Sequence, residues 1–221
     1  MDAIEAIHGR RSVRAFKPDP IPREVLEKIM RAALAAPSWE NTQPWEFTVL
    51  GPKAMKEFRA AVAERTRAGI KPNLDIPWPK FSGVHRERGR RLGKEIRGSL
   101  GLSKDDPQGL RDWWLSMTQF FNAPNGVIVY MDASLGEWSI LDTGMAVENL
   151  MIAAWHCGVG TCVMSAVVNY PDIIRSLFNI PDSKRIIVGI AVGYPDFSSP
   201  KATFRASHEA LETMVKWQGF E

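Results

Sequence analysis

The sequence predicts an α+β protein, and three observations support this fold class. Apolar residues at helical spacing alternate along the chain with short apolar runs typical of buried strands. Clean repeats of strand, helix and strand are few, which favours α+β over a doubly wound parallel sheet. No linker divides the chain into two cores, so we expect a single domain over residues 1–221.

The first quarter of the chain predicts three helices and one strand. Ile4 and Ile7 share one face of a short helix, and Pro22 suits the first turn of the next. Pro37 ends that second helix, and Pro52 opens a third that carries Met55, Phe58 and Val62 at helical spacing. The expected elements are helices at 2–9 and 22–36, a strand at 46–50, and a helix from 52.

An irregular stretch and a basic stretch follow. Three prolines interrupt residues 69–84, which predicts a long loop. Residues 85–97 then hold seven basic side chains, opposed only by Glu87 and Glu95. Such a run is either a solvated helix face or a flank that collects anions. We expect residues 70–115 to form a lid or insertion over a functional site, because long loops are often functional.

The second half of the chain supplies most of the expected sheet. An aromatic-rich helix is expected at 110–121 and a buried strand at 126–131. Ser139 is a candidate N-cap for a long apolar helix that ends at Gly158. Two more strands and a helix complete the fold, at 160–165, 185–192 and 171–178 respectively.

Composition excludes several classes of function. The net charge of +3 is too small to favour a nucleic-acid partner, and no stretch approaches 18 uncharged apolar residues, so we expect no membrane span. The N-terminus lacks the basic and apolar regions of a signal peptide, and we expect a cytoplasmic protein. Cys157 and Cys162 are too few for a disulfide framework, and no His pair stands at metal-ligand spacing, so we expect free thiols and no metal.

The segment Arg10-Arg11-Ser12-Val13-Arg14 is the first candidate site. Three guanidiniums and a hydroxyl within five residues can bind a phosphate, because arginine forks match its oxygens bidentately. Without a counter-anion the cluster repels itself, and a phosphomonoester with about two negative charges would relieve it. The alternative is a basic turn on the surface.

A second candidate lies between Pro37 and Trp45. Its residues are Pro37-Ser38-Trp39-Glu40-Asn41-Thr42-Gln43-Pro44-Trp45. Amide and hydroxyl groups between two prolines and two tryptophans suit a planar ring that is stacked and read along its polar edge. The alternative is an ordinary turn, although a turn needs only one Asn or Gly.

These two segments, in this order, resemble the FMN-dependent nitroreductase family. Residues 140–150 resemble the family's central dimer helix, and residues 158–165 resemble its strand beside the flavin. Residues 189–195, followed by Phe204-Arg205, resemble the last core strand and a late phosphate-binding arginine. The resemblance covers essentially the whole chain and implies a central mixed sheet flanked by helices in an intertwined homodimer. The runs 78–102 and 113–124 further resemble the branch of nitroaromatic and nitrobenzoate reductases.

The resemblance also implies roles for individual residues. Arg10, Arg11, Ser12 and Arg14 would hold the FMN phosphate and ribityl chain, and Arg205 would complete this clamp. From the partner subunit, the groups that reach the flavin would be Ser38, Asn41 and Gln43. Backbone around Met164 and Ser165 would face the N5 edge of the ring. The chain departs from the family at Ala166, where many relatives have glycine, and at His208, where some have a second arginine.

The implied activity transfers hydride from NADH or NADPH through FMN to a nitroaromatic, quinone or similar planar aromatic acceptor, by a ping-pong mechanism. No catalytic side chain is expected, because the flavin carries the chemistry. The four His residues show no catalytic triad, and no Gly-x-Gly-x-x-Gly run follows a strand, which disfavours a Rossmann fold. Two alternatives stay open: another flavin reaction, such as reductive dehalogenation, enoate reduction or flavin fragmentation, and a flavin-binding protein without turnover.

Overall fold

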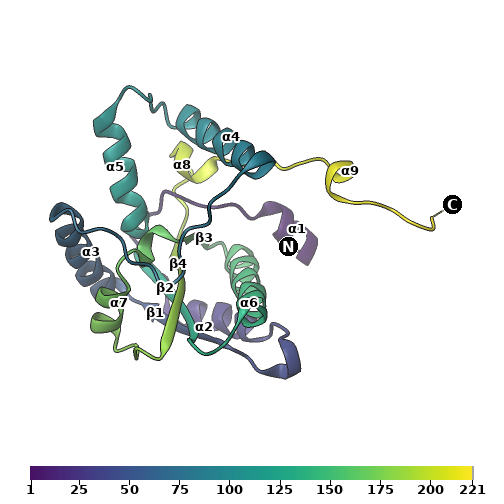
Figure 1. Ribbon diagram of the computed structural model, residues 1–221, viewed down its shortest axis with the longest axis horizontal. Coiled ribbons are helices and arrows are strands. Elements are labelled where there is room, and N and C mark those ends of the chain that lie inside the picture. The colour runs from purple at the N-terminus through teal and green to yellow at the C-terminus, as the bar shows by residue number, and fades with distance from the viewer. Residues whose placement is uncertain (221) are drawn as a thin grey trace.

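A four-stranded antiparallel sheet forms the centre of the computed structural model, which describes residues 1–220 (Figure 1). In sheet order the strands are β1 (Trp45–Leu50), β2 (Asn125–Asp132), β4 (Lys184–Gly193) and β3 (Gly160–Met164). All three pairings are antiparallel. The expectation of a mixed sheet is therefore wrong for residues 1–220: parallel pairing there is limited to one bridge, from Ser12 to Thr161. The N-terminal segment contributes that single bridge instead of a full strand.

The helices follow the sequence prediction closely. The main helices are α1 (Ala3–Gly9), α2 (Arg23–Leu34), α3 (Pro52–Arg67), α4 (Gly83–Ser99), α5 (Pro107–Thr118), α6 (Glu137–His156) and α7 (Pro171–Phe178). Short elements are η1 (Trp39–Asn41), η2 (Phe120–Asn122), η3 (Ala166–Val168), α8 (Pro200–Thr203) and α9 (Leu211–Met214). One boundary is corrected. The N-cap of α6 is Gly136 and not Ser139, because Gly136 is extended and Glu137 already lies in the first turn, where a carboxylate favours the helix dipole.

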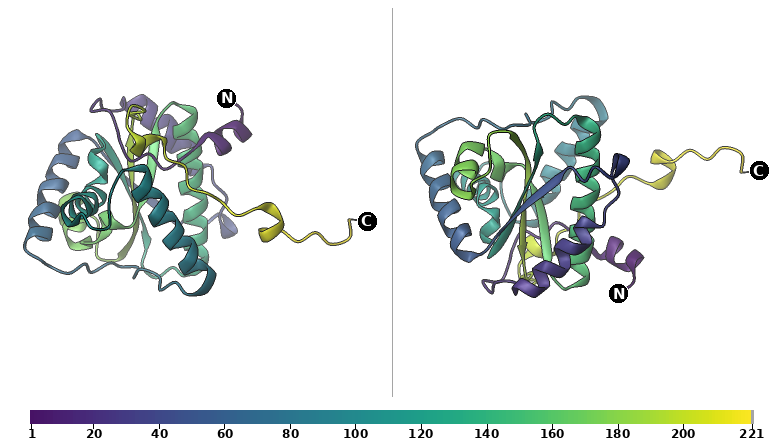
Figure 2. Two further views of the ribbon diagram at one scale, coloured as in Figure 1. Left: turned by 90° about the horizontal axis from the view of Figure 1, so that it is seen from above. Right: turned by 90° about the horizontal axis from the view of Figure 1, so that it is seen from below.

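Helices cover both faces of the sheet (Figure 2). On one face α2 and α6 pack together over the sheet, burying Ile29 and Leu150. On the other face α3, α7 and η2 bury Phe58 against Phe120, with ring centroids 5.2 Å apart. The apolar residues at helical spacing in α3 thus face the core, as the sequence predicts. Expectation and structure agree on an α+β fold.

The N-terminal segment after α1 packs against the edge strand β3 and forms a hydrogen bond with it. The Val13 amide donates to the Thr161 carbonyl at 2.9 Å, and the Val13 side chain is fully buried. A Cβ at Gly160 would lie 2.7 Å from Cγ2 of Val13, so only glycine permits this approach. The backbone beside Ser12 and Arg14 is therefore anchored to the sheet.

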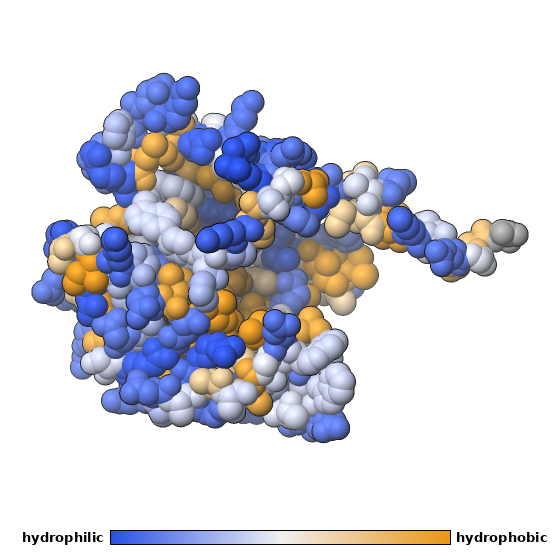
Figure 3. All heavy atoms as spheres, in the orientation of Figure 1, coloured by the Kyte–Doolittle hydropathy of each residue, from blue (hydrophilic) through white to orange (hydrophobic). Residues whose placement is uncertain are grey.

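The segment from residue 69 to the end of α5 contributes few side chains to the buried core. Residues 70–82 are irregular, as predicted, and α4 has no buried residue. Trp78 from the irregular stretch meets Trp114 of α5 edge to face, with centroids 5.9 Å apart. Figure 3 shows the molecule hollowed below α4, with hydrophilic residues along the rim. After α8 the C-terminal segment passes α4 and extends away from the body (Figure 1).

Among the described residues, no helix combines the length and apolar character needed to cross a membrane.

Candidate functional site

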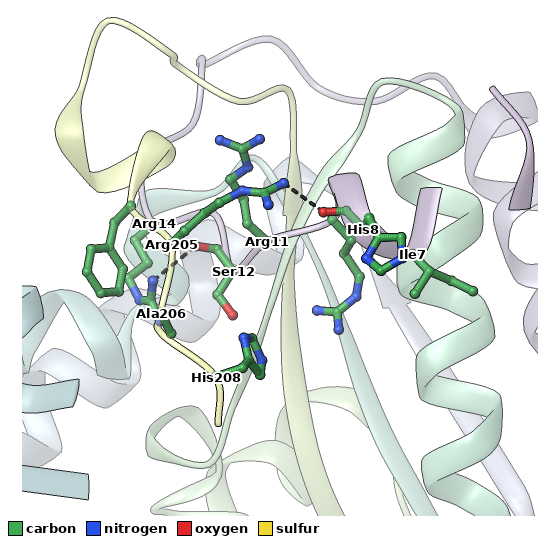
Figure 4. Close-up of a pocket in the computed structure, with 10 residues that line it drawn as sticks. Ile7, His8, Arg11, Ser12, Arg14, Arg205, Ala206 and His208 are labelled. Atoms are coloured by element: carbon green, nitrogen blue, oxygen red, sulfur yellow. Dashed lines mark hydrogen bonds between the residues drawn. The ribbon is translucent and has the colours of Figure 1, made fainter. Parts of the chain in front are cut away.

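A cavity of about 560 Å³ lies where the N-terminal segment meets the C-terminal segment. Its lining residues come from α1, the stretch after it, and the stretch after α8: Ile7, His8, Arg10, Arg11, Ser12, Arg14, Phe204, Arg205, Ala206 and His208. Figure 4 shows these side chains around one space. The structure therefore brings together five residues from the sequence prediction, although Arg205 is nearly two hundred residues from the others. We call Arg10, Arg11, Arg14 and Arg205 the arginine cluster.

Backbone carbonyls hold two arms of the arginine cluster in place. Nη2 of Arg205 donates to the carbonyls of His8 at 2.7 Å and Gly9 at 3.0 Å, which are at the C-terminal end of α1. That end of a helix carries partial negative charge and favours a cation. Nη1 of Arg14 donates to the Ser12 carbonyl at 3.0 Å, and its guanidinium lies 5.7 Å from the Phe204 ring centroid. These contacts orient both guanidiniums.

The other two arginines differ in their charge balance. Nε of Arg10 lies 3.0 Å from Oε1 of Glu148 on α6, so this arginine has a carboxylate partner. The Arg11 guanidinium stacks on Trp155 at 5.2 Å. Burial lowers the pKa of Arg11, and repulsion from Arg205 lowers it further. Nε of Arg11 is buried and has no hydrogen-bond partner among residues 1–220.

The cluster consequently has an excess of positive charge. Within residues 1–220, Glu148 is the one carboxylate paired with any of the four guanidiniums. An anion in the cavity would relieve the repulsion and would accept hydrogen bonds from several arginine donors. A dianionic phosphate matches both the charge and the forked donor geometry. The site can therefore bind a phosphate group.

A buried thiol lies beneath the cluster. Burial raises the pKa of Cys162 on β3, while the nearby Arg14 charge and a hydrogen bond with Ser12 oppose that rise. A thiol with a raised pKa stays protonated near neutral pH and is a poor nucleophile. Cys162 is therefore a packing residue under the site, and both cysteines are free thiols, as predicted.

The second candidate segment lies at the opposite end of α6. The Trp39 amide donates to Oδ2 of Asp142 at 3.1 Å, near the start of the helix, whereas Arg11 stacks on Trp155 near its end. At 1.5 Å per residue, these two contacts are about 20 Å apart along the helix axis. The structure does not bring Ser38, Asn41 and Gln43 to the arginine cluster of the same chain.

The backbone of this second segment is strained. Glu40, Asn41 and Gln43 have φ values of 50°, 56° and 47°, in the left-handed region that non-glycine residues rarely adopt. Oγ of Ser38 accepts a hydrogen bond from the backbone amide of Gln43 at 2.9 Å, which stabilises the turn. Strain of this kind costs about 1–3 kcal/mol per residue and is typical of functional sites. Asn41 and Gln43 are exposed and available to a ligand or a second chain.

The predicted residues at the end of β3 lie along the same sheet edge as the cluster. Thr161 bridges to Ser12, and Ser165 follows about 13 Å further along, at 3.3 Å per residue. Met164 is buried, whereas Ser165 and Val163 are exposed. Because β3 is an edge strand, the backbone between the cluster and Ser165 presents a continuous edge on which a long ligand could lie.

Two residues that support the arginine cluster from α6 are not predicted from the sequence. Glu148 balances Arg10, and a signal for it existed, since an acid within a long apolar helix requires a cationic partner. Trp155 supports Arg11 from that same helix. His208, which the sequence already singles out, lines the cavity. No group of His, Cys, Asp and Glu side chains suited to a metal ion occurs in the described part of the chain.

Comparison with known proteins agrees with this geometry. A sequence profile described as "Nitroreductase family" matches residues 7–194. A 4-nitrobenzoate reductase from Pseudomonas putida is 31% identical over 221 residues, which covers 100% of this chain and 96% of that protein. The FMN- and NADPH-dependent nitroreductase NfnB of Sphingopyxis sp. strain HMH superposes with a TM-score of 0.95, at 27% identity over 100% of both chains.

A second solved structure is the FMN-dependent nitroreductase NfnB of Mycobacterium smegmatis in complex with NADPH. It superposes with a TM-score of 0.93, at 26% identity over 98% of this chain and 97% of that one. The profile match spans most of the chain, and the relatives are matched along nearly their full length. The chain therefore belongs to the nitroreductase family.

Proposed function

We propose that this chain is an FMN-dependent oxidoreductase that takes reducing equivalents from NADH or NADPH and reduces a planar aromatic acceptor, such as a nitroaromatic or a quinone. The arginine cluster around one cavity, in a chain of this family, is the observation that supports it most. The related 4-nitrobenzoate reductase and the FMN- and NADPH-dependent NfnB proteins point to the same chemistry.

The arginine cluster fits the phosphate of FMN. Arg11 has a buried Nε without a partner among residues 1–220, and its pKa is lowered by burial and by Arg205. A phosphate would accept hydrogen bonds from the guanidiniums of the arginine cluster and would neutralise its excess positive charge. The residues that would hold it are Arg10, Arg11, Ser12, Arg14 and Arg205. Backbone around Met164 and Ser165 would line the flavin ring further along β3.

When bound, FMN would supply the redox chemistry that couples oxidation of NADH or NADPH to reduction of the acceptor. The protein's part is to bind, orient and exclude water. The arginine cluster fixes the phosphate end, and the β3 edge limits the position of the ring. No side chain of this chain is assigned as a catalytic acid or base.

A complete site requires two chains. Ser38, Asn41 and Gln43 are about 20 Å along α6 from their own arginine cluster, at 1.5 Å per residue, so they would reach the flavin of a second copy. The strained backbone at 40–43 would present their polar groups to the ring edge. Neither chain alone then holds the whole site.

Exposed apolar residues support this homodimer. Trp138 and Leu141 at the start of α6 are 66% and 56% exposed, and Trp39 packs against Trp138 at 5.5 Å. The C-terminal segment adds exposed Trp217 and Phe220. Large apolar patches on a small protein usually mark an interface. Leu150, which also lies in the stretch that resembles the family's dimer helix, is instead buried in the core of its own chain. Sedimentation should therefore give a dimer, and an FMN-binding monomer would contradict the two-chain site.

Residues 70–115 would cover the flavin and select the acceptor. The edge-to-face pair Trp78–Trp114 offers two partly exposed aromatic surfaces, which suit a flat ring. A Trp78→Ala variant should raise KM for a nitroaromatic acceptor and leave FMN binding unchanged, because Trp78 is not among the residues that line the phosphate cavity.

Stopped-flow spectroscopy tests the proposed function directly. NADH or NADPH should bleach the flavin absorbance of the FMN-loaded protein, and a nitroaromatic added afterwards should restore it. Parallel initial-rate lines are expected, since the two half-reactions are separate. If neither nicotinamide bleaches the flavin, the protein is a flavin binder without this turnover. If bleaching occurs but a halogenated phenol is the acceptor that restores the colour, the reaction belongs to another class.

A further inference from the structure

The arginines of α4 divide into two opposite faces. On one face Arg88 and Arg91 both bind Glu209 of the C-terminal segment, with Nε of Arg88 at 3.2 Å from Oε1. On the other face lie Arg86, Arg90 and Arg97, which we call the arginine stripe. At 3.6 residues per turn they point within about 40° of one another, roughly opposite to Arg88.

The arginine stripe is uncompensated. No ion pair involves Arg86, Arg90 or Arg97 within residues 1–220, although α4 also contains Glu87 and Glu95. Glu95 instead accepts a hydrogen bond from Ser207 on the other face. Three like charges on one helix face repel one another, and an anion between them would relieve that repulsion. The sequence alone does not distinguish these arginines. In the structure, Arg88 and Arg91 are paired with Glu209, whereas the arginine stripe has no ion-pair partner among residues 1–220.

Glycines form the floor between the stripe's arginines. Gly89 and Gly93 line a surface cavity of about 380 Å³ together with Phe81 and the stripe. Glycine inside a helix is destabilising relative to alanine, so its presence needs a reason. At Gly89 packing gives none, because an added Cβ would meet no atom within 4 Å. The glycines leave the helix surface open to a flat or small group, beside the exposed ring of Phe81.

We propose that the arginine stripe is a second anion-binding site, which takes the carboxylate or phosphate group of a small substrate. This inference rests on the proposed function, because the stripe belongs to the segment that would cover the flavin. Arginine forks bind carboxylate and phosphate bidentately, and Phe81 supplies an aromatic wall. The anion is either the carboxylate of an aromatic acceptor or a phosphate of the dinucleotide donor.

Direct binding measurements test the stripe without turnover. Calorimetric titration of the FMN-loaded protein would use 4-nitrobenzoate, neutral 4-nitrobenzamide and adenosine 2′,5′-bisphosphate. In the Arg86→Gln/Arg90→Gln variant, one of the two anions should bind roughly two- to fivefold more weakly for each arginine removed, the scale of an exposed ion pair. Binding of 4-nitrobenzamide should stay unchanged. Loss of 4-nitrobenzoate affinity assigns the site to the acceptor, and loss of bisphosphate affinity assigns it to the donor.

Two further variants make the result specific. Arg31→Gln removes one arginine charge from an exposed position on α2 and should leave all three affinities unchanged. Gly89→Ala keeps every charge and should raise thermal stability, yet it should weaken binding of the same anion because the new methyl group occupies the floor. A solvated face would give the higher stability with unchanged binding.

Unchanged affinity for both anions in the double variant overturns the inference. An equal loss for 4-nitrobenzamide overturns it too, because the effect would then not depend on charge. Failure of the proposed function appears elsewhere, as absence of flavin bleaching by NADH and NADPH in the unmodified protein.

Discussion

The two groups of arginines in this protein differ in how they are held. Backbone carbonyls fix Arg14 and Arg205 of the arginine cluster, aromatic rings support Arg11 and Arg14, and the whole cluster is seated on β3. The arginine stripe lies on α4, a helix without a buried residue, and its side chains have no ion-pair partner in the described chain. A group held in advance loses little conformational entropy on binding, whereas a loose one loses more. The first arrangement suits a cofactor that stays bound, and the second suits a substrate that exchanges.

Removal of arginines from the two groups should have unequal effects on FMN affinity. Arg14→Ala or Arg205→Ala should weaken FMN binding by about 1.5–3 kcal/mol each, the scale of a hydrogen bond to a charged group. Arg14→Lys should restore only part of this loss, because a point charge cannot supply the fork. Arg86→Ala is the matched change in the stripe and should leave FMN affinity unaltered. Fluorescence titration measures all four, and equal effects in the two groups would remove the distinction between them.

The contact between Val13 and Gly160, which anchors the arginine cluster to β3, can be disturbed without removing any charge. Gly160→Ala would place a Cβ 2.7 Å from Cγ2 of Val13 and 2.9 Å from Cγ of Pro195. Overpacking of this kind costs about 1–3 kcal/mol of folding stability, and we expect weaker FMN binding as well because Ser12 and Arg14 would shift. Gly98→Ala is the control, since a Cβ there meets nothing within 4 Å. Chemical denaturation gives the stabilities. Equal stability of the two variants would show that the segment around Val13 can shift away from β3 without cost.

The ion pairs that Arg88 and Arg91 of α4 form with Glu209 predict a smaller effect, which depends on pH. Hydrogen bonds from Arg91, and the charges of Arg91 and Arg88, lower the pKa of Glu209 below its usual 4.5. A carboxyl with a lowered pKa stabilises the folded arrangement above its unfolded pKa, and this contribution is lost as pH falls through the lower folded value. NMR titration of the Glu209 carboxyl should therefore give a pKa below 4.5, and Arg91→Gln should move it back upward. A wild-type value at or above 4.5 would mean that the ion pair does not form in solution.

The sequence predicts regular elements well where local patterns determine them. Met55, Phe58 and Val62 recur at helical spacing and are all buried in α3, and the apolar run of β2 lies inside the sheet. At the start of α6, Ser139 is a good N-cap by residue type, yet the helix is capped at Gly136. The mixed sheet was expected from the family resemblance, whereas all strand pairings among residues 1–220 are antiparallel and parallel pairing there is limited to the bridge from Ser12 to Thr161.

The candidate site is only partly visible in the sequence. Arg205 was found through resemblance, since no local pattern links it to His8 and Gly9. The pairing of Arg91 with Glu209 joins residues far apart in the chain, and periodicity carries no information about such contacts. The left-handed backbone of Glu40, Asn41 and Gln43 was also unforeseen, because none of these residues is glycine. Hydrogen bonds within the turn, such as that from the Gln43 backbone amide to Oγ of Ser38, accompany that conformation.

Identification of the bound flavin tests the central claim most directly. The arginine cluster surrounds one cavity at the end of the β3 edge, which suits the single terminal phosphate of FMN. The purified protein, incubated with excess FMN and desalted, should be yellow and should release FMN in a ratio of about one per chain on denaturation, since each chain contributes one cluster. Chromatography of the released flavin distinguishes FMN from FAD. A protein that stays colourless after this incubation, or that binds FAD in preference to FMN, would contradict the account.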